Sequence, residues 1–321
     1  MTDNRPTIAI MTSGGDAPGM NAAIQGAYCN ASELGYRVLG IRSGFTGLLE
    51  GDLFQLQDGD VKNIIQIGGT ILGTSRCEEF QKETAQKQAA DYCRKMGIQA
   101  VIIIGGDGSF AGAQKLAGHG IGVVGIPATI DLDIGCSDYT IGFDTAVNSA
   151  MESIDKIRDT SRAHSCCSVI EVMGRRAGYI ALWCGIANTA KTILVPEKQE
   201  MDSFIEHLKS IQFTDGTVIV AEGCGKAEEI AQKIQESLNI HTRANVLGFL
   251  QRGGSPTCKD RLYGCMMGAY AADLIHSGKR CHVVVSQNGE VSHMEITEAL
   301  SMTKPFPDYL YHLNQVISKC N

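Results

Sequence analysis

Two carboxylates, Asp131 and Asp133, follow a hydrophobic run from Ile121 to Ile126 that is typical of a buried strand. The run stops at Pro127, which cannot donate a hydrogen bond to a neighbouring strand. In an open α/β sheet, ligands bind on the loops beyond the carboxyl ends of the strands. A carboxylate on such a loop can accept a proton or hold a metal ion. Aspartate also suits a plain turn, because it hydrogen bonds to its own backbone. This strand end alone therefore does not distinguish a binding site from a plain turn.

A second strand end surrounds one carboxylate with glycines. The apolar run Ala100 to Ile104 is typical of a buried parallel strand, and it leads into Gly105-Gly-Asp-Gly-Ser109. Glycines let backbone N–H groups approach a phosphate chain, and Asp107 among them is placed to hold its magnesium. A tight turn is the alternative interpretation. The probable helix that follows, from Phe110 to Leu116, favours a binding loop.

Two further loops are rich in glycine and could also bind phosphate. Thr12-Ser-Gly-Gly-Asp-Ala-Pro-Gly19 lies between a short strand, Thr7 to Met11, and a helix-compatible run from Met20 to Leu34. A helix N-terminus carries partial positive charge, which suits a phosphate. The loop matches neither the Walker A pattern nor the dinucleotide fingerprint. Gly68-Gly-Thr-Ile-Leu-Gly-Thr-Ser-Arg76 ends in an arginine that is either a solvated charge or a fork of donors for phosphate.

Arginines and a glutamate follow the later strands. Met173-Gly-Arg-Arg-Ala-Gly178 comes after one strand, and Glu222 and Arg252 close two more. Carboxylates for a base and a metal, arginines for spread negative charge, and glycines for backbone donors are the parts of a phosphoryl-transfer site. No Ser-His-Asp or Cys-His arrangement is evident in the sequence.

Strands alternate with helices along almost the whole chain, which predicts parallel sheets with helices on both faces. Near the end, the runs Cys281 to Ser286 and Val291 to Ile296 flank Asn288-Gly289 and predict a hairpin. Pro307 to Lys319 predicts a last helix. A division into two domains near residue 138 fits the length of 321 residues.

Composition narrows the class of protein. The net charge of −7 argues against a nucleic-acid binder, although a local cluster of arginines is enough for an anionic substrate. The 12 cysteines are scattered without a C-x-x-C pair, so the spacing does not indicate zinc, and free thiols in a reducing cytoplasm are expected. Nothing at the N-terminus resembles a signal peptide, and no apolar run approaches the length of a membrane span.

Several long stretches, taken together, resemble the bacterial-type 6-phosphofructokinase family. Their order and spacing match from about Ile8 to about Pro305. The stretches are Thr12 to Ala23, Gly105 to Ser109, Thr129-Ile-Asp131, Asp138-Tyr-Thr-Ile-Gly-Phe143, Glu171-Val-Met-Gly-Arg175 and Gln251-Arg-Gly-Gly-Ser-Pro256.

The resemblance implies two similar Rossmann-like lobes, each a mainly parallel sheet flanked by helices. Residues 1–138, with about 258–305 packing back on them, would form an ATP-binding lobe. Residues 139–257 would form a sugar-phosphate-binding lobe, and 306–321 a C-terminal helix. It further implies a cytoplasmic homotetramer with active sites between subunits. The implied activity is the glycolytic phosphorylation of fructose 6-phosphate by ATP and Mg²⁺.

The resemblance also assigns roles to residues. Asp131 would be the base that takes the sugar hydroxyl proton, with Asp133 nearby, and Asp107 would hold magnesium. The ATP contacts would be Gly15, Arg76, Cys77, Gly106, Asp107, Gly108 and Ser109. The transferring group would be stabilised by Arg76 and Arg175. The sugar phosphate would be held by Thr129, Ile130, Met173, Gly174, Glu222, Arg252 and, from a neighbouring subunit, Arg243. Pyrophosphate-using relatives usually carry Asp at the position of Gly108, so this glycine indicates ATP.

Two departures fall in the sugar-phosphate pocket. The family usually has an arginine, reaching in from the neighbouring subunit, at the position of Cys166, and a histidine at the position of Phe249. A hydrogen bond to a charged group contributes about 1.5–3 kcal/mol, so these losses weaken or redirect phosphate binding unless something compensates. Arg162, four residues before Cys166, is a candidate replacement.

Further departures concern regulation and leave alternatives open. Gln25 and Cys29 stand where regulated members carry arginines for a nucleotide effector, while Arg158 at another effector position remains. We therefore expect weak or absent control by ADP or phosphoenolpyruvate. Two alternatives to the fructose 6-phosphate kinase are a kinase for another sugar acceptor and a weakly active subunit that modulates an active sibling.

Overall fold

The computed structural model describes residues 5–198 and 201–320, which form two compact units. Within these residues, the first unit comprises 5–129, 134–144 and 252–304, and the second the rest. The division differs from the expected limits at four places. Residues 139–144 group with the first unit, because a short strand there pairs with the first sheet, and 252–257 group with it as well. Residues 130–133 and residue 305 group with the second unit.

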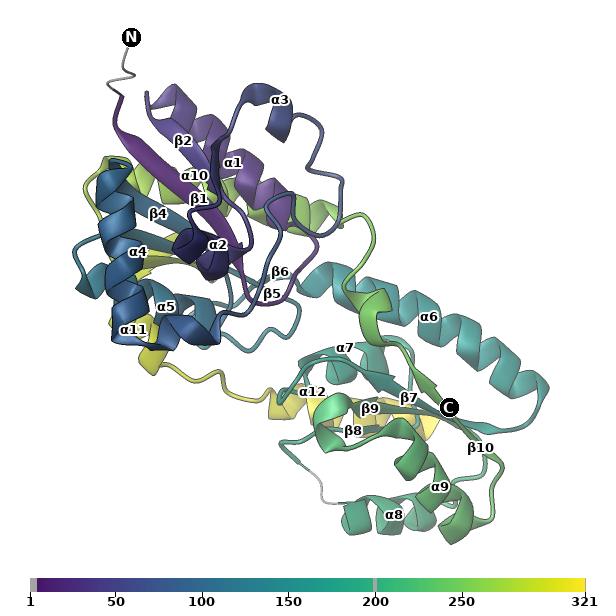
Figure 1. The fold of residues 1–321 in the computed structure, drawn as a ribbon. Coiled ribbons are helices and arrows are strands. Elements are labelled where there is room, and N and C mark those ends of the chain that lie inside the picture. Colours follow the sequence, from purple (N-terminus) through teal and green to yellow (C-terminus); the bar gives the residue numbers. More distant parts are fainter. Residues whose placement is uncertain (1–4, 199–200, 321) are drawn as a thin grey trace. The chain divides into compact units, whose positions relative to one another are not determined.

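The first unit has a mixed, mainly parallel sheet covered by helices, as Figure 1 shows. Its strands, in order across the sheet, are β12 (Glu290–Glu295), β11 (His282–Gln287), β5 (Gly122–Thr129), β4 (Ile98–Gly105), β1 (Thr7–Ser13), β2 (Arg37–Ile41) and β3 (Leu53–Gln55), with β6 (Ile141–Gly142) beside the end of β5. Its helices are α1 (Met20–Glu33), α2 (Gly44–Glu50), α3 (Asp58–Val61), α4 (Glu83–Lys95), α5 (Asp107–Gly118), α10 (Cys258–His276) and α11 (Ile296–Ser301), plus the 3-10 turn η1 (Glu78–Gln81).

The central strands of this sheet are apolar along their length because both faces are covered. All seven residues of β1 are buried, and β4 is buried except at Gln99. Continuous apolar runs of this kind are typical of parallel strands between two helical layers. The α1 and α10 helices pack against each other, while α4 contacts α2 and α5.

The second unit has a smaller, wholly parallel sheet. Its strands, in order, are β10 (Thr242–Val246), β7 (Cys167–Val172), β9 (Gly216–Ala221) and β8 (Thr192–Leu194). The helices are α6 (Phe143–Ala163), which begins in the first unit, α7 (Tyr179–Ala187), α8 (Met201–Ser210), α9 (Ala227–Leu238) and α12 (Asp308–Ile317), with 3-10 turns η2 (Glu222–Cys224), η3 (Gly248–Gln251) and η4 (Ser318–Cys320). The expected α/β class, with mainly parallel sheets flanked by helices, is confirmed.

The predicted hairpin is confirmed, and two predicted boundaries are wrong. Asn288 and Gly289 have φ values of 53° and 84° between antiparallel β11 and β12. Pro127 does not end β5. It lies at the last position paired to β4, and β6 takes over pairing at Ala128, so its missing N–H removes little. The helix expected from Phe110 begins three residues earlier, because Gly106 serves as its N-cap.

A buried carboxylate holds β6 in place. Asp260, fully buried in the first turn of α10, accepts hydrogen bonds from the Tyr139 hydroxyl (2.5 Å) and the Gly142 N–H (2.6 Å). Burial, and then the charge of Asp260, raises the pKa of Tyr139, so its hydroxyl stays protonated and donates. The adjacent Thr140 hydroxyl donates to the Thr129 carbonyl (2.7 Å), which connects this network to the end of β5.

Among the described helices, none has both the length and the apolar character needed to cross a membrane.

Replacing Tyr139 with phenylalanine should destabilise the protein by about 1–3 kcal/mol, because a buried carboxylate then loses a donor. The midpoint of urea unfolding measures this loss. Tyr263→Phe is the matched control, since Tyr263 packs against Tyr139 with ring centroids 4.5 Å apart but does not contribute this hydrogen bond. Equal effects of the two substitutions would contradict the prediction.

Candidate functional site

Three predicted site segments meet at one edge of the first sheet. β1, β4 and β5 are neighbours and run parallel, so their carboxyl ends, at Ser13, Gly105 and Thr129, lie at the same edge. Gly105 approaches β1 so closely that an added Cβ would lie 2.4 Å from the Ser13 carbonyl oxygen. The Ser109 hydroxyl donates to that carbonyl (3.0 Å). The loops after β1 and β4 are therefore fixed against each other.

The loop that carries Arg76 is attached to the same place. The Gly14 N–H donates to the Ser75 carbonyl (3.2 Å), and the Thr74 hydroxyl donates to the Gly14 carbonyl (3.0 Å). Arg76, exposed, and Cys77, half-buried, follow directly. The structure thus brings the backbone of the predicted ATP contacts after β1 and β4 together with the segment leading to Arg76.

Gly15 allows an arginine to lie against this edge. An added Cβ would be only 3.1 Å from Nη1 of Arg252, whose Nη1 also lies 3.4 Å from Oδ1 of Asp16. The Arg252 side chain is only 17% exposed. Predicted as a sugar-phosphate contact, Arg252 belongs to the first unit and lies beside the predicted ATP loop.

The N-terminus of α5 carries the predicted magnesium ligand. Asp107 and Gly108, both exposed, and buried Ser109 form its first turn after the N-cap Gly106. The unpaired N–H groups of a helix start favour anions. An added Cβ at Gly108 would meet nothing within 4 Å, so open space borders this turn. An exposed carboxylate oxygen at such a place fits magnesium, which takes oxygen ligands and commonly shares them with substrate phosphates.

No group of three or more His, Cys, Asp or Glu in the described parts of the chain is arranged to hold a metal. A magnesium ion that arrives with a nucleotide commonly takes one or two protein carboxylates together with the substrate phosphates.

The second unit places a carboxylate against a backbone turn. β7 and β9 are parallel neighbours, and Glu222 follows β9 while Met173 to Arg175 follow β7. Oε1 of Glu222 accepts hydrogen bonds from the N–H groups of Gly174 (3.1 Å) and Arg175 (2.5 Å). The turn is unusual because Gly174 has a φ of 140° and Arg175 one of 55°. Glu222 thereby stabilises a backbone conformation that leaves the Arg175 side chain exposed.

A residue without a predicted role completes this turn. The carboxamide of Gln251, fully buried, accepts a hydrogen bond from the Met173 N–H (2.9 Å). Gln251 begins one of the family-like stretches, but glutamine alone carries no signal for a backbone contact 78 positions away.

Phe249 lies at the predicted sugar side. It is 79% exposed and lines a cavity of about 210 Å³ together with Met173 and Glu222. The cavity's other lining residues are Glu171, Val172, Val246 and Gly248. The lining contains two carboxylates and no cation.

The aspartate pair forms a tight turn that groups with the second unit. Asp131 is 3% exposed and Asp133 is half-buried, while Ile130 is buried. Leu132 between the aspartates has a φ of 55°, a conformation rare for leucine. Burial, followed by the charges of Glu197 and Asp133, raises the pKa of Tyr179 to about 12. Its neutral hydroxyl donates to the Pro305 carbonyl (2.9 Å).

Two of the predicted residues lie at the opposite end of the second sheet. Arg243, exposed on β10, pairs in register with Ser168, whereas the Met173 turn follows Val172. Four residues of strand span about 13 Å. Cys166, immediately before β7, lies at the same end as Arg243. Within one unit these positions are therefore not brought to Glu222.

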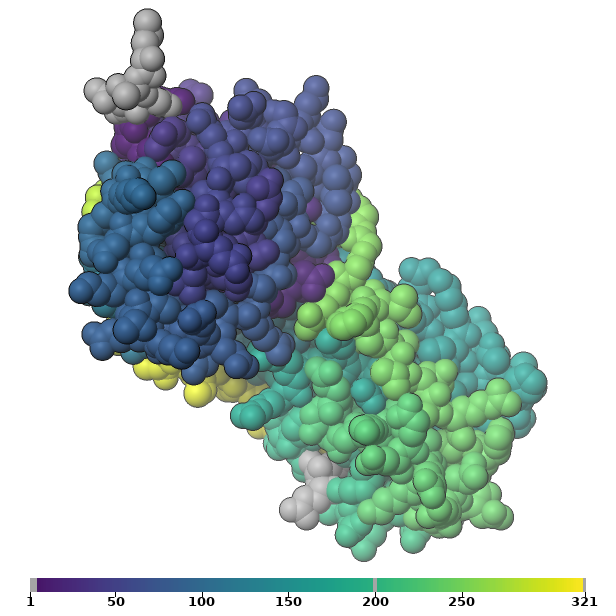
Figure 2. Space-filling view, viewed as in Figure 1, coloured from purple at the N-terminus to yellow at the C-terminus, as the bar shows by residue number. Residues whose placement is uncertain are grey.

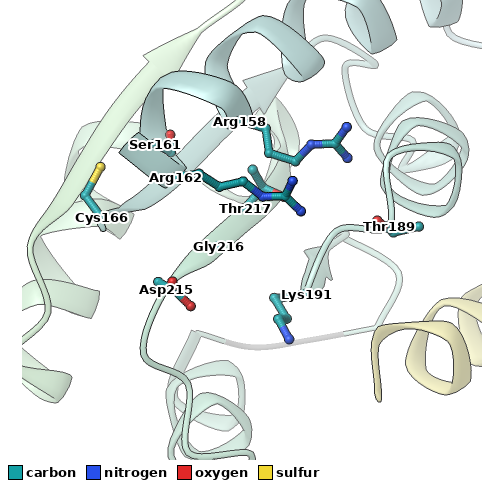
Figure 3. A pocket seen from close by; sticks show the side chains of 9 residues that line it. All are labelled: Arg158, Ser161, Arg162, Cys166, Thr189, Lys191, Asp215, Gly216 and Thr217. Atoms are coloured by element: carbon teal, nitrogen blue, oxygen red, sulfur yellow. The ribbon is translucent and has the colours of Figure 1, made fainter. Parts of the chain in front are cut away.

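Cys166 lines a basic cavity of about 180 Å³ in the second unit. Figure 3 shows Arg158 and Arg162 extending from α6, and Lys191 approaching from another side. Arg162 and Cys166 line the same cavity, but Figure 3 shows the Arg162 side chain extending away from Cys166, toward Arg158. The expectation of weak effector control, which came from the uncharged Gln25 and Cys29 on α1, stays a prediction.

Known proteins match the chain over nearly its whole length. A family profile described as Phosphofructokinase matches residues 7–275. The chain is 46% identical over 317 residues to an ATP-dependent 6-phosphofructokinase from Clostridium botulinum, covering 98% of this chain and 99% of the relative. It is 47% identical over 315 residues to the protein of that name from Clostridium tetani, covering 97% and 99%.

Solved structures agree on the fold. A phosphofructokinase structure from Saccharomyces cerevisiae superposes with a TM-score of 0.82 at 29% identity, covering 98% of this chain and 47% of that one. This chain thus spans about half the length of the yeast chain. A pyrophosphate-dependent phosphofructokinase from Marinobacter aquaeolei superposes with a TM-score of 0.83 at 22% identity, covering 94% and 86%, which supports the fold alone. With its family profile and its full-length relatives, the chain belongs to the phosphofructokinase family.

Proposed function

We propose that the protein transfers the γ-phosphoryl group of ATP to fructose 6-phosphate, yielding fructose 1,6-bisphosphate and ADP, in cytoplasmic glycolysis. The observation that carries this proposal is the 46% identity, over 98% of the chain, to relatives named ATP-dependent 6-phosphofructokinase. The hydrogen-bonded loops after β1 and β4 support a phosphate-binding role, because they gather glycines and a helix N-terminus at one strand edge.

On the ATP side, the backbone of Gly15 and of Gly106 to Ser109 binds phosphates, and Arg76 and Cys77 border the nucleotide. Asp107 would hold Mg²⁺, which neutralises phosphate charge when bound. Gly108 leaves this turn open, consistent with a bulky triphosphate donor.

On the acceptor side, Asp131 accepts the proton of the attacking sugar hydroxyl, with Asp133 as its charged neighbour. Arg175, together with Arg76, stabilises the charge that spreads over the transferring group. The sugar phosphate is held by Thr129, Ile130, Met173, Gly174, Glu222, Arg252 and a neighbouring subunit's Arg243.

A second candidate, a kinase for a different sugar acceptor, is favoured by one observation. The cavity beside Glu222 has two carboxylates, Phe249 at its lining and no cation. A phosphate group bound in this cavity needs positive charges from residues outside its lining, whereas an uncharged polyol does not need them.

Asp131→Asn should lower kcat for fructose 6-phosphate by about 10²–10⁴-fold, because the amide cannot accept the hydroxyl proton. A coupled assay of ADP release measures it. Asp202→Asn is the control, since that carboxylate is 90% exposed and pairs only with Lys233 among the described residues. A variant at Asp131 with near-normal turnover would rule out its role as base.

Phe249→His should lower the half-saturating concentration of fructose 6-phosphate by about tenfold, since one hydrogen bond to a charged group contributes about 1.5–3 kcal/mol. Steady-state kinetics over a range of sugar measures the change, and kcat should move little. Tyr309→His, at a position of 75% exposure on α12, is the control. If Phe249→His does not gain affinity for fructose 6-phosphate, and the unmodified protein prefers another sugar, the second candidate is favoured.

We also infer a homotetramer with active sites completed across subunits. Val246, Phe249 and Leu250 are each more than half exposed, and Figure 2 shows their segment, in green, at the surface of the second unit. Clustered exposed apolar side chains mark interaction sites. Arg243 on the same strand, unable to reach its own unit's Glu222, is free to serve a neighbour.

Leu250→Asp should therefore produce smaller species in light scattering and reduce activity with fructose 6-phosphate, because a charge would enter the interface. Tyr309→Asp, at an equally prominent position of 75% exposure on α12, should keep the assembly of the unmodified protein. A monomeric unmodified protein would exclude this arrangement.

A further inference from the structure

Two histidines are neighbours on the terminal hairpin of the first unit, and neither is a proposed catalytic or substrate contact. In the antiparallel pairing of β11 and β12, His282 lies opposite Glu295 and Val284 lies opposite His293. Side chains two positions apart on a strand share a face, so the two histidines are diagonal neighbours on one face of the hairpin. Their ring centroids are 5.3 Å apart, and the ring planes meet at 60°.

Each ring has one nitrogen held by a neighbouring group. Nδ1 of His282 lies 2.9 Å from the Arg280 carbonyl oxygen, which can only accept, so Nδ1 is the donor. Nδ1 of His293 lies 2.8 Å from the hydroxyl oxygen of Tyr270 on α10, which can accept or donate. Histidines that bind a metal almost always use their other nitrogen in this way, because the contact fixes the ring and its tautomer. Nε2 of neither ring makes a hydrogen bond to the described chain.

The spacing of the two rings suits one shared metal ion. A transition-metal ion binds an imidazole nitrogen at about 2.0–2.1 Å. At that bond length and a tetrahedral angle, two imidazoles on the same ion have centroids about 5 Å apart. The observed 5.3 Å is close to this value. Because both histidines belong to paired strands, the backbone maintains the spacing before an ion arrives.

The surroundings favour the neutral form of His293, which is the form that binds a metal. Burial, and then the charges of Lys279 and His282, lower the pKa of His293, so its imidazole is neutral at pH 7. Lys279 also repels a bound cation, whereas the carboxylate of Glu295, opposite His282, attracts it.

The pair supplies two protein ligands and leaves the other positions open. No third His, Cys, Asp or Glu among the described residues joins the pair in a metal-binding arrangement. Water therefore fills the rest of the coordination shell, as it does at metal sites with an open position.

We propose that His282 and His293 together bind one divalent transition-metal ion of the zinc, nickel or copper class. Imidazole nitrogen suits these ions, whereas magnesium prefers oxygen ligands. The ion cross-links β11 to β12, so its binding stabilises the folded protein. The proposal does not depend on the kinase activity.

Titration calorimetry on the full chain, freed of metal by a chelator, tests this with Ni²⁺ as the probe. Ni²⁺ should bind with one equivalent at submillimolar concentration, and it should raise the melting temperature. Mg²⁺ in about tenfold excess should not displace it, because two imidazoles discriminate against magnesium.

His282→Asn and His293→Asn should each weaken Ni²⁺ binding by at least about tenfold, since asparagine keeps a donor near the position of Nδ1 but lacks Nε2. Tyr270→Phe, which removes only the partner of His293, should weaken it by about tenfold and tests the pair independently if the asparagine variants fail to fold. His312→Asn, at an exposed position on α12, is the matched control, and Asp107→Asn separates the pair from the proposed magnesium ligand. Both should bind Ni²⁺ unchanged.

The proposal fails if Ni²⁺ does not bind at millimolar concentration. It also fails if both histidine variants of the hairpin bind Ni²⁺ as tightly as the unmodified protein, because the ion would then be held by thiols or by other histidines.

Discussion

The parallel alignment of β1, β4 and β5 is the constraint on which the first unit depends. Ser13, Gly105 and Thr129 are far apart in the sequence, yet parallel pairing brings the ends of their strands to one edge. The loops at this edge are joined by a backbone hydrogen bond from the Gly14 N–H to the Ser75 carbonyl. The hydroxyls of Ser109 and Thr74 also donate to backbone carbonyls of neighbouring loops. A rigid backbone edge of this kind presents preorganised donors to an anion.

The second unit fixes its turn by a different means. Glu222 is the acceptor for two consecutive N–H groups of the Met173 to Arg175 turn, and Gln251 is the acceptor for a third. The left-handed conformation of Arg175 is thereby held without a glycine at that position. Phe249, at the position where the family resemblance implies a histidine, is not one of the residues that accept these three hydrogen bonds.

The sequence alone predicted most strands, the terminal hairpin and the position of each glycine-rich loop, because these depend on local apolar runs and turn residues. It failed where pairing between distant segments decides the outcome. Pro127 lies inside β5 because it pairs with β4 and because β6 continues the pairing at Ala128 and Thr129. The α5 helix begins at Asp107, with Gly106 as its N-cap. The contact from Gln251 to Met173 left no local signal, since it depends on tertiary packing.

The first unit is assembled from three separate stretches of chain, and this has a consequence for its biosynthesis. β11 pairs with β5, and α10 packs on α1, so residues beyond 252 complete a sheet whose other strands were made much earlier. A ribosome releases the chain in order, at about 5–20 residues per second. The β5 strand therefore keeps an uncovered edge until β11 (His282–Gln287) has been synthesised. Until then the nascent chain exposes apolar surface of this sheet.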